Sequence, residues 1–85
     1  MHLNLGIVLF NLGKIEDAID EYSNALTLEP SYIDAHFNIA AAYLLIAAEK
    51  DKAIYHFNQV LSLNPDYKNK KFIEQALAKL EDSRR

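Results

Sequence analysis

The side chains of this chain that suit metal or acid–base chemistry best are three histidines, and no cysteine accompanies them. They are His2, His36 and His56. A structural zinc site takes four ligands, usually thiolates and imidazoles, so two histidines without a third ligand nearby would hold zinc only weakly. The sequence therefore predicts no metal site.

Four carboxylates, Glu16, Asp17, Asp20 and Glu21, lie close together in the chain and have the composition of a general acid–base set. The spacing places them on the polar face of a predicted helix, where Glu16 and Asp17 meet the positive end of the helix dipole. Acid–base catalysis needs a cleft that holds the substrate, and we expect none there. No Gly-x-Ser-x-Gly motif or phosphate-binding glycine loop is present either. We predict no catalytic residue, no cofactor and no enzyme activity.

Charge and hydropathy argue against a nucleic-acid or membrane partner. Residues 1–67 carry nine acids and three lysines, whereas residues 68–85 carry six basic residues and three acids. An acidic body repels phosphate, and the basic residues of the C-terminal part are interleaved with acids. The longest weakly polar run, residues 39–48, is about half as long as a membrane span. No signal-peptide pattern follows Met1, and we expect a cytoplasmic protein, with which the lack of cysteine is compatible.

Five segments of the chain have helical periodicity. Gly13 suits a helix end because glycine adopts the left-handed backbone conformation, and Pro30 and Pro65 stop the helices before them. No segment alternates polar and apolar residues with period two, so the predicted fold class is all-α. The last segment has one narrow apolar stripe, which is typical of a helix that ends a stack. The expected helices span residues 2–12, 16–28, 33–46, 50–63 and 68–82.

The segments form an internal repeat, in which residues 4–30 recur as residues 38–65. Equivalent positions in the first helix of each copy are 34 residues apart, and those in the second helix, such as Tyr22 and Phe57, are 35 apart. The second copy therefore contains one extra residue between its two helices. Self-similarity at this period indicates stacked helical hairpins that bury their apolar faces against one another.

The repeated residues resemble the tetratricopeptide repeat family, whose unit sets small residues, aromatic residues and a closing proline at fixed positions. The first copy supplies Leu5-Gly6, Ala18, Tyr22, Ala25 and Pro30, and the second supplies Ile39-Ala40, Tyr43, Ala53, Phe57 and Pro65. The resemblance implies a right-handed solenoid of antiparallel helix pairs. It also implies one domain over residues 1–85. We expect repeat 1 at about 1–32, repeat 2 at about 33–67 and a capping helix at about 68–82.

Two positions depart from the family's pattern. His2 and His36 stand where the family often has a large residue such as tryptophan, which implies imidazoles between helices, each with a satisfied nitrogen. The turn glycine of the first copy, Gly13, is replaced by Ala47-Ala48 in the second.

In this family the first helix of each hairpin lines a concave groove that binds peptides. Carried across residue by residue, the resemblance assigns to that groove Leu3, Asn4, Ile7, Phe10, Asn11, Asp34, Phe37, Asn38, Ala41, Leu44 and Leu45. Asn4 and Asn38 resemble the asparagine ladder of some members, and an amide can both donate to and accept from a peptide backbone. The alternative is two polar residues on an exposed helix face. The carboxylate clamp of chaperone-binding members is absent, because Leu3 and Ile7 stand at two of its positions.

The predicted function is a non-catalytic protein–protein interaction module, an adaptor or scaffold that binds a protein or peptide. The alternative is a self-association module that forms a homo-oligomer. In that case the glycine-free turn between residues 46 and 52 continues as helix, and the second hairpin opens into a domain-swapped dimer. We favour the closed hairpin because it avoids the entropy cost of association.

Overall fold

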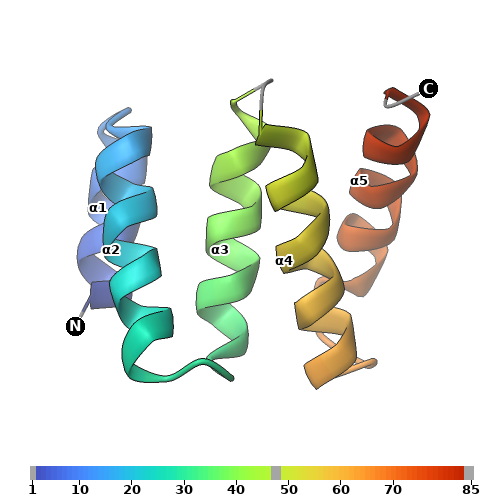
Figure 1. Ribbon diagram of the computed structural model, residues 1–85, viewed down its shortest axis with the longest axis horizontal. Coiled ribbons are helices and arrows are strands. Elements are labelled where there is room, and N and C mark those ends of the chain that lie inside the picture. Colours follow the sequence, from blue (N-terminus) through green and yellow to red (C-terminus); the bar gives the residue numbers. More distant parts are fainter. Residues whose placement is uncertain (1, 47–48, 84–85) are drawn as a thin grey trace.

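A computed structural model describes residues 2–46 and 49–83 and contains five helices in one row of stacked pairs (Figure 1). The helices are α1 (His2–Asn11), α2 (Ile15–Leu28), α3 (Ile33–Leu44), α4 (Lys50–Leu63) and α5 (Lys70–Ser83). No strand occurs in the described ranges, so the all-α prediction is confirmed, and every helix end lies within two residues of its predicted place. Successive helices run antiparallel, and the two termini lie at opposite ends of the row (Figure 1).

The first turn ends α1 with a Schellman motif, as Gly13 predicted. The amide of Lys14 donates to the carbonyl of Leu9 at 2.9 Å, and the amide of Gly13 donates to that of Phe10 at 3.0 Å. This arrangement needs a left-handed residue, and Gly13 has φ +82°. The two bonds satisfy carbonyls that a helix end otherwise leaves unpaired.

The second turn closes without glycine. After α3 ends at Leu44, the amides of Leu45 and Ile46 donate to the carbonyls of Ala42 and Tyr43 at 3.1 and 3.0 Å, which tightens the last turn. Ala47 and Ala48, which belong to the turn that would continue as helix in a domain-swapped dimer, lie outside the described residues. The helices on either side nevertheless pack on each other within one chain. The continuous helix required by a domain swap is therefore not formed.

The core consists of two apolar clusters that share Tyr43 at their boundary. In the first hairpin the Tyr22 ring lies against Gly6, where a Cβ atom would come within 2.5 Å of the ring. In the second hairpin Phe57 is fully buried in the same cluster as Ala40. The small residue beside a large aromatic ring lets the paired helices approach closely, as the repeat predicted.

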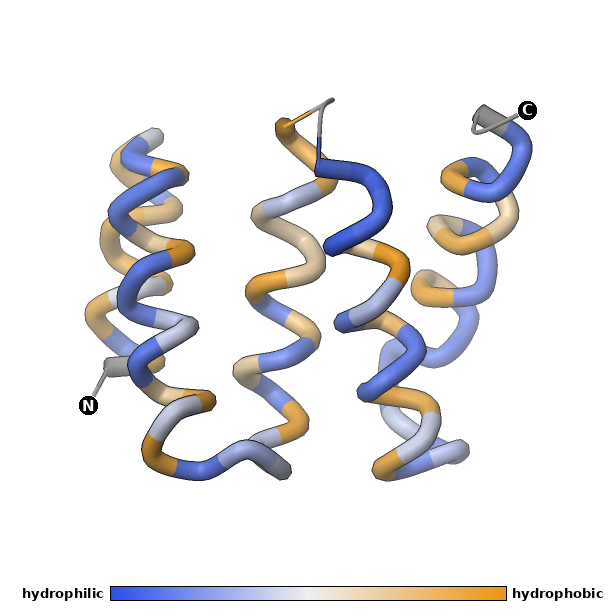
Figure 2. Tube along the Cα trace, in the orientation of Figure 1, coloured by the Kyte–Doolittle hydropathy of each residue, from blue (hydrophilic) through white to orange (hydrophobic). Residues whose placement is uncertain are grey.

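The last helix packs through one side only, and Figure 2 shows its outer side as mostly hydrophilic. Ile73 and Leu80 are buried against the second cluster. The segment leading into α5 is held by Tyr67, whose hydroxyl donates to Asp34 Oδ1 of α3 at 2.6 Å. Burial, and then this hydrogen bond, raise the pKa of the Tyr67 hydroxyl. None of the helices in the described ranges is long and apolar enough to cross a membrane.

Candidate functional site

A pocket opens between the first helices of the two hairpins. It has a volume of about 250 Å³. Its walls come from α1 and α3, and the α2 side chain Tyr22 contributes to its lining. The lining residues are Ile7, Phe10, Asn11, Tyr22, Asn38 and Ala41. Five of these six are residues that the family resemblance assigned to the groove.

The register of the helices explains why these residues meet. Ile7 and Asn11 are four apart on α1, and Asn38 and Ala41 are three apart on α3, so each pair shares one helix face. The pocket therefore combines apolar walls with the amides of Asn11 and Asn38. Neither amide is deeply buried, so both are available to a ligand. Amides of this kind suit hydrogen bonding to a peptide backbone.

Tyr22 was expected only as a helix-packing residue, and it also lines the pocket. Its side chain is only 2% exposed, and burial raises the pKa of its hydroxyl above the ordinary value. Gly6 lets the Tyr22 ring lie against α1, because a Cβ atom there would come within 2.5 Å of the ring. The repeat register alone did not indicate this role.

The other predicted groove residues take different places. Leu3 is buried in the first core cluster, and Leu44 is half-buried against the second. Asp34 accepts the hydrogen bond of the Tyr67 hydroxyl with its Oδ1 atom. Asn4 is exposed on α1, and Leu45 is 63% exposed just after α3 ends.

Phe37 is engaged with the last helix. Its ring lies 5.6 Å from the Tyr67 ring, 5.9 Å from that of Phe72 and 6.1 Å from that of Phe57, measured between centroids. Such aromatic contacts stabilise the end of the stack. Phe37 therefore helps to hold α5 in place. Its position in the sequence alone could not distinguish this role from lining the groove.

Two of the three histidines, His36 and His56, form a pair that the sequence did not predict. His36 Nδ1 lies 2.9 Å from His56 Nδ1, and His36 Nε2 lies 2.8 Å from the carbonyl oxygen of Pro30. A carbonyl only accepts, so in the neutral pair His36 donates from Nε2, and His56 donates from Nδ1 to His36 Nδ1. The prediction that His36 lies at a helix interface with a satisfied nitrogen is confirmed.

Burial, together with the nearby His36, lowers the pKa of His56 to about 4. The second hairpin therefore keeps this imidazole neutral around neutral pH. The side chain of His2, which occupies the same repeat position as His36, lies outside the described part of the structure. Within residues 2–46 and 49–83, no three His, Asp or Glu side chains gather in a way that could hold a metal ion.

Comparison with known proteins shows to which family this chain belongs. A family model described as TPR repeat matches residues 6–46, and one described as tetratricopeptide repeat matches residues 34–67. This chain belongs to the tetratricopeptide repeat (TPR) family. The two overlapping matches extend from α1 to the segment that leads into α5.

Two relatives are similar to this chain over most or all of its length. The human protein named DnaJ homolog subfamily C member 7 is 27% identical over 85 residues, which is all of this chain and 17% of that protein. The peroxisomal targeting signal receptor of Saccharomyces cerevisiae is 37% identical over 67 residues, 79% of this chain and 11% of the receptor. The chain thus spans less than a fifth of either relative. Family and relatives together support a protein–protein interaction module.

Proposed function

We propose that this TPR unit is a non-catalytic adaptor that binds a peptide or a short helix of a partner protein in the groove between α1 and α3. The observation that carries the proposal is the pocket itself, in which apolar walls flank the amides of Asn11 and Asn38. The proposed unit has two repeats, at about residues 1–32 and 33–67, and a capping helix at about 68–82.

The chemistry of the pocket favours binding over turnover. Its lining combines apolar side chains, two amides and one phenol whose pKa burial has raised. Apolar walls bury side chains of the ligand, while the amides pair with its backbone without reading its sequence. One relative is named a receptor for a targeting signal, which supports a peptide as the ligand class.

The test begins with peptides selected from a displayed random library, whose affinities are then measured by calorimetry. Asn38→Ala should weaken the binding of the selected peptides by about 1 kcal/mol, the usual cost of losing a hydrogen-bond partner in a desolvated contact. Ala41→Phe should reduce their affinity further, because the larger ring fills the space that the ligand would occupy. Asn58→Ala, an exposed asparagine on α4, is the matched control and should leave affinity unchanged.

Two results would contradict the proposal. Full affinity in both Asn4→Ala and Asn38→Ala would place the site elsewhere. Equal weakening by Asn38→Ala and Asn58→Ala would show that the substitutions act on the fold in general and not on the groove. Self-association is the competing function, and light scattering on the free chain separates it from a groove that is open to ligand.

A further inference from the structure

The pocket between α1 and α3 is lined by a tyrosine whose polar end lies at the α1 wall. Tyr22 belongs to the lining although its side chain is only 2% exposed. Its Cζ atom, the carbon that bears the hydroxyl, is 3.2 Å from the position that a Cβ atom would take at Gly6. Gly6 directly precedes Ile7, which is itself a lining residue. The hydroxyl end of the ring therefore lies beside the pocket.

The fold makes no use of this hydroxyl. Within residues 2–46 and 49–83 it forms no hydrogen bond, in contrast to the Tyr67 hydroxyl, which donates to Asp34 Oδ1 at 2.6 Å. In the same ranges no polar side-chain atom is fully enclosed without a partner, so the Tyr22 hydroxyl keeps contact with solvent. Because Tyr22 lines the pocket, the pocket gives the hydroxyl this access. A ligand in the pocket would meet a free hydrogen-bond donor there.

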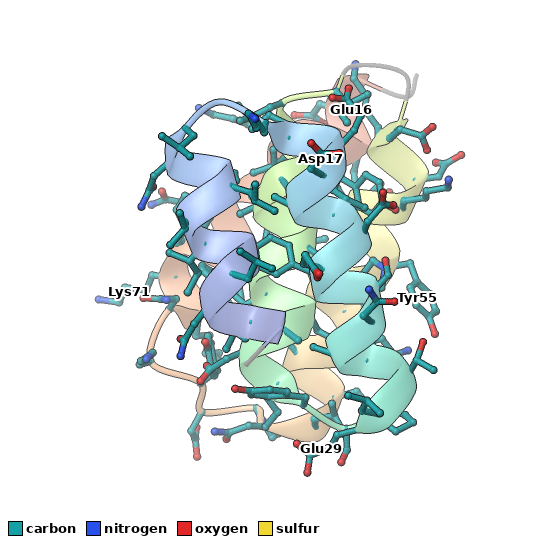
Figure 3. All side chains as sticks on the ribbon, turned by 90° about the vertical axis from the view of Figure 1, so that its left-hand side faces the viewer. Glu16, Asp17, Glu29, Tyr55 and Lys71 are labelled. Atoms are coloured by element: carbon teal, nitrogen blue, oxygen red, sulfur yellow. The ribbon has the colours of Figure 1, made fainter. Side chains whose placement is uncertain are left out.

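The lining of the pocket is polar but uncharged. Among the described residues that line it, the polar ones are two amides and Tyr22, whose hydroxyl stays protonated at neutral pH because burial raises its pKa. Asp20 and Glu21, the neighbours of Tyr22 in sequence, line a separate hollow. Figure 3 shows Glu16 near the start of α2 and Glu29 beyond its end, whereas Tyr22 lies in the middle of that helix. A charged ligand group would therefore lose water in the pocket without gaining a counter-charge.

Size and polarity together define the side chain that fits. The volume of about 250 Å³ is below the roughly 300–1,000 Å³ of pockets that enclose drug-sized ligands, so the pocket suits one side chain. A hydrocarbon side chain would displace water from the Tyr22 hydroxyl and leave it unpaired. A carboxamide offers a neutral acceptor to that hydroxyl and a donor to the amide oxygen of Asn11 or Asn38. Its methylene groups match the apolar wall of Ile7 and Ala41.

We propose that the pocket selects a glutamine side chain of the partner peptide, and that the Tyr22 hydroxyl recognises it by donating to the amide oxygen. This inference rests on the proposed function, because it names the side chain that the groove recognises. Glutamine fits better than asparagine, since the hydroxyl belongs to a nearly buried side chain and the longer stem reaches deeper. Tyr22 thus has two roles: its ring packs the first hairpin, and its hydroxyl determines specificity.

The test selects peptides from a displayed random library on the natural chain and, in parallel, on Tyr22→Phe. Glutamine should be enriched at one peptide position in the first selection and not in the second. Calorimetry then compares the most enriched peptide with versions in which methionine or glutamate replaces that glutamine. Methionine has a similar length but no amide, and glutamate adds a charge. Each replacement should weaken binding to the natural chain about tenfold or more.

A double-mutant cycle assigns the preference to the hydroxyl. In Tyr22→Phe the glutamine peptide should bind at most about threefold more tightly than the methionine peptide, because the atom that distinguishes them is gone. The urea midpoint of Tyr22→Phe should equal that of the natural chain, since the lost hydroxyl has no partner in the described ranges. Tyr67→Phe is the matched control. It loses the same atom from a bound hydroxyl, so its urea midpoint should fall while its affinity for the peptide stays unchanged.

The outcomes separate this inference from the proposed function. A glutamine preference that Tyr22→Phe removes supports it. Peptides that Ala41→Phe weakens but that lack this preference, or keep it in Tyr22→Phe, would overturn the inference and leave the groove as the binding site. Peptides that Ala41→Phe does not affect, or a library without any binder, would overturn both. A urea midpoint that falls as far in Tyr22→Phe as in Tyr67→Phe would also overturn the inference, because the hydroxyl would then be bound within the fold.

Discussion

At the residue scale, single atoms decide how closely the helices approach. A Cβ atom built at Gly6 would lie 2.5 Å from Tyr22 Cε1 and 2.7 Å from Cδ1. Tyr22 is only 2% exposed and belongs to the first core cluster, so a Cβ atom at Gly6 would press on a packed ring. Glycine is therefore required here by space, whereas at Gly13 it is required by the left-handed backbone.

Gly6→Ala should lower the free energy of unfolding by about 1–3 kcal/mol, the usual cost of overpacking a core. Alanine's better helix propensity, worth about 1 kcal/mol, offsets part of this loss. Urea denaturation followed by circular dichroism measures the change. Asn24→Ala, on the exposed side of α2, should be neutral or slightly stabilising, and an equal loss there would contradict the steric explanation.

Mild acid should destabilise the fold through His56. Its folded pKa of about 4 lies below the value near 6.5 expected in the unfolded chain. Between these values the unfolded state binds more protons, so the free energy of unfolding falls as the pH falls. From about pH 7 to about pH 5 the loss should reach about 1–2 kcal/mol. Denaturation curves at both pH values should show a smaller change in His56→Gln; an identical change would exclude His56 as the cause.

At the scale of elements, α5 is attached differently from the other helices. It packs on α4 through Ile73 and Leu80, and its entry is fixed by Tyr67 and by the ring contacts of Phe72. It has no following helix on its outer side among the described residues. Its attachment to α3 therefore depends on a few side chains.

Tyr67→Phe should loosen this attachment. The substitution removes the hydroxyl that donates to Asp34 and should lower the free energy of unfolding by about 1 kcal/mol. Hydrogen exchange should then speed up in α5 more than in α2, because α5 opens without the rest of the stack. Tyr55→Phe on exposed α4 is the control, and uniform acceleration across all helices would show that the hydrogen bond supports the whole fold instead.

At the scale of the whole molecule, the two hairpins and the last helix form one row whose cores meet at Tyr43. The second hairpin closes within its own chain, so assembly does not need a second copy to complete either core. Exposed apolar residues occur on or just after every helix of the row, for example Val8 on α1, Leu28 on α2 and Phe72 on α5.

We therefore predict that the free chain is a monomer of 9.7 kDa in size-exclusion chromatography with light scattering. The reason is that a closed hairpin buries its faces without the entropy cost of association. Val8→Glu should leave the mass unchanged and serves as the control for contact through α1. A dimer that persists in Val8→Glu would indicate exchange of helices despite the closed turn.

The sequence by itself determined the elements and their order. Helix periodicity, Gly13, Pro30 and Pro65 are local signals, since each acts within one or two turns of the chain. They located all five helices within two residues. The family resemblance then implied which side of α1 and α3 faces a groove, and that assignment stays a prediction, although Ile7 and Asn38 line one pocket between these helices.

Only the tertiary structure decided which side chains meet between elements. The pairing of His36 with His56, the lining role of Tyr22 and the engagement of Phe37 with α5 join residues far apart in the chain. The closed second turn was also decided by tertiary structure. Its sequence favours a continuous helix, and the packing of α3 on α4 overrides that preference. Local propensity is fixed by neighbours in sequence, whereas these contacts depend on how closely and at what angle the helices pack.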